Sequence, residues 1–445
     1  MEHNFALASG KGRAGVAVVR ISGPRTKSVV EKICGDLPQP RRATLMTLRN
    51  PKDAGDIIDK ALVLWFPGPD SLTGEDIAEF HMHGGRGVLN NLFEVLGTLE
   101  GLRVAEPGEY LRRAFELGKL ELTQTEAVND LVWAETEAQR KQALRQMQGV
   151  LGAIYEDWRA RLLSALGKSE AEIDFSDEDL PEDLKEIAHA SVRKIYEEIM
   201  KHLDDKGRGE RIRDGFTIVL LGPPNSGKSS IINRLAKNDV AIVSDIPGTT
   251  RDLIEVRMDI AGYPVNIIDT AGLREVESEI EAEGVRRARR KADSADLRLH
   301  VFEASCWPDL PTDNVGKMEA GDIILLNKCD LDQPAIGARK KAKGLKAVAM
   351  SALTGEGVDD LLEVLERAVI GALEHCEAPG LTRARHRKAL EECAGALDRF
   401  LKNLGDMSMR SEDLRLATRA LGQITGRVDV EDMLDIIFAD FCIGK

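Results

Sequence analysis

A glycine-rich loop between a strand-like run and a helix-like run limits the folds open to this chain more than any other feature. Residues 222–229 read Gly-Pro-Pro-Asn-Ser-Gly-Lys-Ser and match the pattern G-x-x-x-x-G-K-[ST]. The apolar run 216–221 before the loop predicts a strand, and the run 230–235 after it predicts a helix. In such a loop, backbone N–H groups face phosphate, Lys228 reaches the β and γ phosphates, and the Ser229 hydroxyl binds Mg²⁺. The loop therefore predicts a nucleoside triphosphate site in a doubly wound α/β domain.

Three further motifs narrow the nucleotide to GTP. Asp269-Thr-Ala-Gly272 follows an apolar run and fits D-x-x-G, in which the carboxylate binds Mg²⁺ through water and the glycine amide contacts the γ-phosphate. Asn327-Lys-Cys-Asp330 fits N-K-x-D. Its aspartate can accept the N1 and 2-amino hydrogens of guanine, a pair that adenine does not offer. Ser351-Ala-Leu353 resembles the loop that backs the guanine ring.

The segment between the phosphate loop and Asp269 predicts a switch. Residues 244–252 contain two threonines, and a threonine here can complete the Mg²⁺ shell when the γ-phosphate is present. Leu273 stands where Ras-like proteins carry a water-orienting glutamine, so another group must orient the water and a cation must replace an arginine finger. Asn225 and the Ser244–Thr249 backbone are candidates to hold a monovalent cation there. The predicted GTP-binding residues are Asn225, Ser226, Gly227, Lys228, Ser229, Ser230, Ser244, Asp245, Ile246, Pro247, Gly248, Thr249, Thr250, Asp269, Thr270, Ala271, Gly272, Asn327, Lys328, Asp330, Ser351, Ala352 and Leu353.

The pattern of the chain changes on both sides of the GTPase motifs. Strand-like runs at 15–21 and 60–66 indicate an α+β fold for the N-terminal stretch. Helix-forming residues dominate from about 119, and the chain is helical again after Pro379. We therefore predict a multidomain α+β and α/β protein in which a Ras-like GTPase domain is inserted into an all-α domain. The predicted domains are residues 1–118, the discontinuous helical domain 119–214 plus 372–445, and the GTPase domain 215–371.

Composition excludes several classes of protein. The net charge over 445 residues is −14, which excludes a protein that holds nucleic acid by global positive charge, so any such contact needs a local patch. The six cysteines form no C-x-x-C pair, as expected of free thiols in a reducing cytoplasm. No apolar run approaches the roughly 18 residues of a membrane span, and the N-terminus has no signal-peptide pattern. We expect a cytoplasmic protein without a membrane partner.

Several further motifs stand elsewhere in the chain, in addition to Asn225 within the phosphate loop. They are the switch motifs 245–252 and 269–275, the ending 441–445, and the motifs 12–23, 72–79, 107–115 and 118–127. Together these motifs resemble the MnmE (TrmE) family of tRNA-modification GTPases over the whole chain. Other GTPases share the phosphate loop, but none shares the last five residues together with the N-terminal motifs.

This resemblance implies a function in tRNA modification. The protein would be a homodimer that forms a heterotetramer with the FAD-dependent protein MnmG. The complex would add a carboxymethylaminomethyl or aminomethyl group to C5 of the wobble uridine of certain tRNAs. The N-terminal domain would dimerise and bind 5-formyl-tetrahydrofolate or a related methylene-tetrahydrofolate as one-carbon donor. By motif position the folate ligands are Arg20, Glu79, Lys119 and Lys445, and Cys442 is a candidate nucleophile beside the donor.

The resemblance also implies how GTP is hydrolysed. The GTPase domains would dimerise when K⁺ is bound, and K⁺ would supply the positive charge that an arginine finger provides in other GTPases. Hydrolysis would drive a conformational cycle rather than bond formation on the tRNA. The implied K⁺ ligands are Asn225, Ser244, Ile246 and Thr249, and the implied Mg²⁺ ligands are Ser229 and Thr250. The implied catalytic residues are Lys228 and Glu281, and Glu281 would position the attacking water.

Two other classes of function stay open at this point. A ribosome-assembly or other RNA-binding GTPase would need a basic RNA-binding domain, whereas the helical stretches are acidic overall. A folate-dependent aminomethyltransferase with a merely regulatory GTPase domain would be active without GTP. The basic segments 286–291 and 383–388 could contact tRNA phosphates, be solvated helix faces or contact acidic neighbours. His300 interrupts an apolar run, and we expect it at a strand edge.

Overall fold

The structure, a computed structural model, divides into two compact units. The first contains Met1–Val132, Gln146–Arg193 and Glu392–Lys445, and the second contains Trp133–Arg145 and Lys194–Glu391. The predicted domain boundaries themselves stay a prediction. None of the helices described is long and apolar enough to cross a membrane. The structure describes residues 3–174, 183–238, 240–242, 255–269, 295–310, 318–331, 341–342, 345–374, 380–403, 407–428, 431–439 and 441–444.

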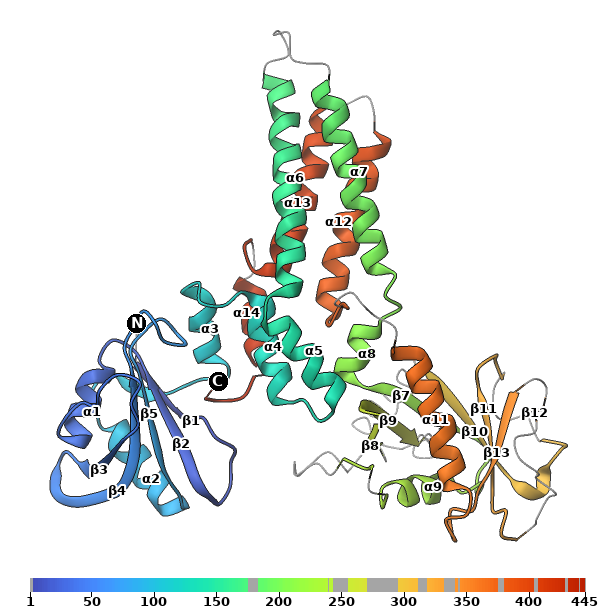
Figure 1. Cartoon of the computed structure of the whole chain (residues 1–445), viewed down its shortest axis with the longest axis horizontal. Helices are drawn as coiled ribbons and strands as arrows, with labels where there is room; N and C mark the ends of the chain where they lie inside the picture. The colour runs from blue at the N-terminus through green and yellow to red at the C-terminus, as the bar shows by residue number, and fades with distance from the viewer. Residues whose placement is uncertain are drawn as a thin grey trace, which may run out of the picture. The chain divides into compact units, whose positions relative to one another are not determined.

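A six-stranded sheet dominates the N-terminal part of the first unit (Figure 1). Its strand order is β3-β4-β5-β2-β1-β6, and only the β1–β6 pair is parallel. The elements are β1 (His3–Leu7), β2 (Ala14–Ser22), α1 (Thr26–Cys34), β3 (Thr44–Asn50), β4 (Asp53–Phe66), β5 (Ile77–Gly84), α2 (Arg86–Gly97), β6 (Leu102–Val104) and α3 (Glu109–Glu116).

The two faces of this sheet differ in character. Val19 of β2 and Phe80 of β5 are fully buried in one core with side chains of α1 and α2. Because successive side chains of a strand point to opposite faces, Arg20 and Glu79 lie on the other face. They stand directly opposite each other in the β2–β5 register. Tyr110 of α3 packs against Ala6 and Ala105 and covers part of that second face. The sheet therefore holds a charged pair on its less covered side.

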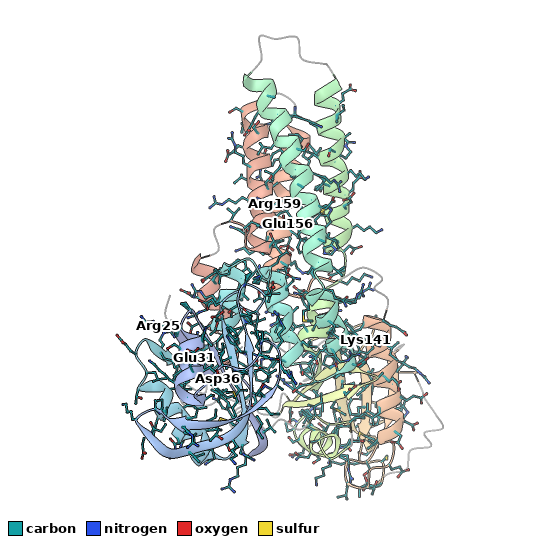
Figure 2. All side chains as sticks on the ribbon, turned by 60° about the vertical axis from the view of Figure 1, so that its left-hand side comes forward. Arg25, Glu31, Asp36, Lys141, Glu156 and Arg159 are labelled. Atoms are coloured by element: carbon teal, nitrogen blue, oxygen red, sulfur yellow. The ribbon has the colours of Figure 1, made fainter. Side chains whose placement is uncertain are left out.

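Long helices form the rest of the first unit, and α7 and α12 continue from it into the second. Thr425, at the end of α13, donates to Glu156 of α6 at 2.8 Å, and Arg415 pairs with Glu170 at 2.8 Å, so the two helices are antiparallel neighbours. Figure 2 labels Glu156 and Arg159 side by side on α6, where they form an ion pair. The helices are α4 (Leu122–Val132), α6 (Val150–Asp174), α7 (Asp183–Leu203), α12 (Ala384–Lys402), α13 (Met407–Thr425) and α14 (Glu431–Ala439).

The second unit contains the α/β fold that the phosphate-loop motif predicted. Its sheet has the order β12-β13-β11-β10-β7-β9-β8, and the strands from β13 to β9 are parallel. Helices α9 and α11 pack on one face, where Ile231 and Leu365 share a core with Ile218 and Leu299. The elements are α8 (Arg208–Asp214), β7 (Phe216–Leu221), α9 (Lys228–Leu235), β8 (Glu255–Ile260), β9 (Tyr263–Asp269), β10 (Leu297–Glu303), β11 (Ile323–Asn327), β12 (Lys341–Ala342), β13 (Leu345–Ala349) and α11 (Val358–Leu373).

The chain enters and leaves this fold at adjacent points. A Cβ atom on Gly209 would lie 2.2 Å from the Leu381 carbonyl oxygen, so the incoming and outgoing backbones touch. Asp205 accepts hydrogen bonds from the Leu381 amide at 3.1 Å and from Arg387 Nη2 at 2.6 Å. Close ends are what an inserted domain requires, in agreement with the predicted insertion.

Helix α5 (Glu137–Met147) begins against the GTPase sheet rather than in the helical bundle. The Ala138 amide donates to the carbonyl of Gly262, in the β8–β9 turn, at 2.9 Å. Gln139 Nε2 donates to the Arg213 carbonyl at 3.0 Å, while Gln139 Oε1 accepts from the Thr136 amide at 3.1 Å. The last bond belongs to a capping box, which starts the helix at this point.

The prediction for His300 is wrong. Strand β10 lies between β7 and β11, so His300 is central in the sheet, and it is fully buried. Its Nε2 lies 2.9 Å from Oδ2 of Asp322, a residue just before β11. A hydrogen-bond partner makes burial of one ring nitrogen tolerable, and here the partner comes from a neighbouring segment that the local sequence does not reveal.

Candidate functional site

The phosphate loop connects β7 to α9, as predicted. A Cβ atom on Gly222 would lie 2.2 Å from the Val301 carbonyl oxygen, and one on Gly227 would lie 2.1 Å from Asn327 Nδ2. Only glycine fits at either position, and Gly227 also has a left-handed φ of +92°. Asn225 is left-handed as well, with φ +65°, which turns the loop tightly before the helix.

The polar groups expected at the phosphates and Mg²⁺ converge at the start of α9. Lys228 is buried and donates from Nζ to the carbonyls of Gly222 and Pro223, each at 2.9 Å. Ser229 Oγ donates to Asp269 Oδ2 at 2.6 Å, so a hydroxyl and a carboxylate meet as a hard, oxygen-only donor set that suits Mg²⁺. Ser226 Oγ is fully buried and has no hydrogen-bond partner within the part of the chain that the structure describes.

The guanine-recognition motif is tied to the phosphate loop. Asn327 Nδ2 donates to the Ser226 carbonyl at 2.9 Å, and Asn327 Oδ1 accepts from the Ala352 amide at 3.0 Å. Lys328 pairs with Glu303. Through Asn327, the loop that would back the guanine is connected directly to the loop that would bind the phosphates.

The other predicted GTP-binding residues differ in how far they are buried. Asp330 is half-buried beyond the end of β11, and Ser351 is fully buried, with its hydroxyl accepting from the Thr354 amide at 3.1 Å. Leu353 is 78% exposed, so it packs against nothing that would fix its position. Several predicted residues lie outside the described residues: Ser244, Asp245, Ile246, Pro247, Gly248, Thr249, Thr250, Thr270, Ala271, Gly272 and Glu281.

A second polar cluster lies on the less covered face of the N-terminal sheet. Arg20 donates from Nε and Nη2 to Glu79 Oε1 at 3.0 and 2.8 Å, and His81 Nε2 lies 3.1 Å from Glu79 Oε2. Burial alone would raise the pKa of the Glu79 carboxyl, but the hydrogen bond with His81 and the charge of Arg20 outweigh it and hold the pKa below its usual value. Glu79 therefore stays an anionic acceptor.

The two ends of the chain meet at Arg20. Tyr110 donates from its hydroxyl to the Arg20 carbonyl at 2.8 Å, and its ring centroid lies 5.6 Å from the guanidinium carbon. Arg20 Nη1 donates to the Gly444 carbonyl at 3.4 Å. The tail is held by a bridge between Pro107 and Ile443. No role was predicted for Tyr110 from the sequence. Its place in the family motif 107–115 was the one signal that could have indicated its support of this site.

The remaining predicted folate residues are distributed around this cluster. Cys442 is half-buried, and its carbonyl accepts from the Gly108 amide at 3.2 Å, which places it in the docked tail. Lys119 is exposed, and its side chain runs beside Gly74, where a Cβ atom would lie 3.1 Å from Lys119 Cε. Lys445 lies outside the described residues. Among these residues, the structure brings Arg20 into contact with Glu79 and with the tail.

A cavity of about 300 Å³ lies beside α3, but none of the predicted site residues lines it. Arg103 of its wall pairs with Glu109 at 2.7 Å, and Arg113 pairs with Glu75 at 2.9 Å. Its buried charges are therefore satisfied within the protein, as expected of a structural network.

We predict that Gly444→Ala releases the C-terminal tail from the N-terminal sheet. Gly444 has φ +95°, and a Cβ atom there would lie 2.2 Å from the Leu7 carbonyl oxygen. Both the dihedral and the clash with backbone oppose a side chain. Carboxypeptidase should remove the last residues of this variant at least tenfold faster than those of the wild type. The matched control is Gly371→Ala in α11, where no atom lies within 4 Å of the new Cβ. Equal digestion of all three proteins would contradict the prediction.

Comparison with known proteins assigns the family. A family profile described as "GTP-binding protein TrmE N-terminus" matches residues 3–119, and one described as "MnmE helical domain" matches residues 122–442. The chain belongs to the MnmE family of tRNA modification GTPases. It is therefore a GTPase of tRNA modification, and the alternative of a ribosome-assembly GTPase is set aside.

Full-length relatives agree with this assignment. The chain is 52% identical to the tRNA modification GTPase MnmE of Paramagnetospirillum magneticum over 445 residues, which covers 99% of each chain. It is 49% identical to the MnmE of Parvibaculum lavamentivorans, with 100% of both chains covered. Among solved structures, Aquifex aeolicus Era bound to GDP and AlF4⁻ is 24% identical. That match covers 40% of this chain and 66% of Era at a TM-score of 0.27.

Proposed function

We propose that this GTPase works with the FAD-dependent protein MnmG to add a carboxymethylaminomethyl or aminomethyl group to C5 of the wobble uridine of certain tRNAs. A folate one-carbon donor would bind the N-terminal domain, and GTP hydrolysis would drive a conformational cycle. The observation that carries the proposal is the Arg20–Glu79 pair, held under the chain's own C-terminal tail. The protein would act in the cytoplasm as a homodimer within a heterotetramer with MnmG.

In the GTP site, each residue has a chemical task. Lys228 would stabilise the charge that develops between the β and γ phosphates, and Asp330 would accept the guanine N–H groups. When bound, Mg²⁺ would neutralise phosphate charge, and Ser229 and Thr250 would hold it, with Asp269 acting through water. Glu281 would place the attacking water.

The charge of an arginine finger would come from K⁺ held between two GTPase domains. Its ligands would be Asn225 in the phosphate loop and Ser244, Ile246 and Thr249 in the switch. The position of Asn225 supports this role, because it is an exposed residue within the tight turn of the phosphate loop, three residues before Lys228.

In the folate site, charge complementarity assigns the contacts. Arg20, Lys119 and Lys445 would supply cationic donors to a folate, and the Glu79 carboxylate beside Arg20 would accept from the N–H edge of the pterin. Because Glu79 stays anionic, it can accept those N–H groups at neutral pH. Cys442 would lie beside the donor as a nucleophile.

GTP turnover in K⁺ and in Na⁺ tests the finger. We expect at least tenfold faster turnover in K⁺, and Asn225→Ala should abolish the difference. The matched control is Asn233→Ala, an exposed asparagine on α9, which should keep the stimulation. Equal rates in both salts for the wild type would refute the K⁺ role without touching the GTPase assignment.

Calorimetry with 5-formyl-tetrahydrofolate tests the N-terminal site. Arg20→Ala should weaken binding by at least tenfold, because it removes a cationic donor from the site and leaves the Glu79 carboxylate without its guanidinium partner. Arg25→Ala, an exposed arginine near α1 that Figure 2 labels, should bind like the wild type. Undiminished binding by the Arg20 variant would remove the folate assignment.

A further inference from the structure

Two glycine-rich loops meet at one end of the N-terminal sheet. The first, residues 8–13, joins β1 to β2, and the second is the turn at Gly85, between the end of β5 at Gly84 and the start of α2 at Arg86. Ala14 pairs with Gly84 in the β2–β5 register, and a Cβ atom on Gly84 would lie 2.6 Å from the Ala14 carbonyl oxygen. Because the two strands are antiparallel, the residue before Ala14 and the residue after Gly84 are neighbours, although they are about 70 positions apart in sequence.

These loops carry cations that have no partner in the part of the chain that the structure describes. Lys11, Arg13 and Arg86 are all exposed, and none of them forms an ion pair or a side-chain hydrogen bond with another described residue. Elsewhere in the same domain Arg20 and Arg113 are bound to glutamates at 2.8 and 2.9 Å. Asp59 of β4 is already bound by His83, which lies one residue before Gly84, at 2.8 Å. Positive charge is thus left free at this end of the sheet.

The backbone around the cations is open as well. No atom lies within 4 Å of an ideal Cβ position at Gly10, Gly12, Gly15 or Gly87. Glycines without neighbours let another molecule approach the main chain closely, so that N–H groups can donate alongside the charged side chains. The cations are also spread over two exposed loops and do not enclose a cavity. This arrangement favours an extended polyanion over a small phosphate.

We infer that this basic loop surface, made of Lys11, Arg13, Arg86 and the glycines beside them, binds the phosphate backbone of tRNA. The inference rests on the proposed function, which makes tRNA the substrate, and it locates the chain's own contact. The protein has a net charge of −14, so an RNA contact must use a local cationic surface. Lysine, arginine and free amides contact backbone phosphates without reading bases, so the contact would serve several tRNAs alike.

The basic loop surface lies close enough to the Arg20–Glu79 pair for one tRNA to reach both. Strand β2 connects Ala14, beside the loops, to Arg20, six residues on. At about 3.3 Å per residue this is roughly 20 Å. A tRNA held by its backbone at the loops therefore has its bases within reach of the sheet face that carries Arg20 and Glu79.

Salt-dependent tRNA binding by the full chain tests the inference. The variant is Lys11→Gln combined with Arg13→Gln and Arg86→Gln, and fluorescence anisotropy follows a labelled tRNA as the KCl concentration is raised. Each phosphate contact releases nearly one counterion, so the slope of log K against log salt should become shallower by about two to three. At physiological salt the affinity should fall by at least about tenfold.

A control triple separates this surface from charge in general. Arg25→Gln, Lys27→Gln and Lys32→Gln, on and beside α1 (Figure 2 labels Arg25 and Glu31), remove the same charge and should leave both affinity and slope unchanged. An equal loss in both triples, or no loss in the first, would overturn the inference. Displacement of tRNA by millimolar inorganic phosphate at constant ionic strength would instead indicate a small-anion site and would also overturn it.

GTP turnover of the same variants keeps this test distinct from that of the proposed function. None of the three cations lies in the GTPase fold, so the K⁺-stimulated rate should be unchanged in both triples. Loss of tRNA binding with normal turnover supports the surface. If the wild type binds no tRNA without MnmG, the inference fails while the GTPase assignment stands.

Discussion

Lys228→Ala is expected to lower kcat/KM for GTP by roughly three to four orders of magnitude. Lys228 is the first residue of α9, and its Nζ is held at 2.9 Å from two carbonyls of the phosphate loop. A buried ammonium in that position would face the bridging and γ-phosphate oxygens, where negative charge grows during hydrolysis. Alanine removes the charge and leaves the loop glycines in place, so the loss should fall on turnover.

Steady-state phosphate release measures this effect. Lys237→Ala, an exposed lysine just beyond the same helix, is the matched control and should turn over GTP like the wild type. Thermal melting should show that both variants stay folded, because Lys228 satisfies carbonyls that water can also reach once the side chain is gone. A Lys228→Ala rate within tenfold of the wild type would contradict the assigned role.

Asp330→Asn is expected to lower the affinity for GTP by roughly two to four orders of magnitude. The aspartate accepts the N1 and 2-amino hydrogens of guanine, whereas an asparagine amide presents a donor where the 2-amino group already donates. Xanthine has a carbonyl at that position, so the variant should prefer xanthosine triphosphate to GTP. The half-buried place of Asp330, after the asparagine that ties the two loops together, supports this geometry.

Competition between the two nucleotides for a fluorescent analogue measures the change in preference. Asp309→Asn removes one exposed carboxylate elsewhere in the same unit and should not alter it. If the Asp330 variant still bound GTP better than xanthosine triphosphate, guanine would be recognised by other residues.

The GTPase elements were predictable because their signals are local. The strand, loop and helix from Phe216 to Leu235 are consecutive in sequence, and two glycines with a lysine and a serine define the chemistry. Asp269 and Asn327 could be placed near them because each follows a predicted parallel strand, and the ends of such strands meet at one edge of a sheet. The structure shows both in contact with the loop.

The N-terminal site could not be derived in that way. Arg20 and Glu79 are 59 residues apart and became candidates only through the family resemblance. Their pairing depends on the register between β2 and β5, which in turn depends on burial of one face of each strand. The role of Tyr110 was missed and the position of His300 was predicted wrongly for the same reason. Their partners, Arg20 and Asp322, are distant from them in sequence.

From its residues alone, then, this chain is predicted to contain a GTPase domain inserted into a helical domain. Its last five residues match the ending of the MnmE family. Only the folded structure shows that this ending lies on Arg20, that α5 begins on the β8–β9 turn, and that free cations gather where Ala14 meets Gly84. Motifs are read over a few adjacent residues, where backbone geometry links side chains directly. Contacts between distant segments depend on which apolar faces are buried together, and that is settled by packing of the whole unit.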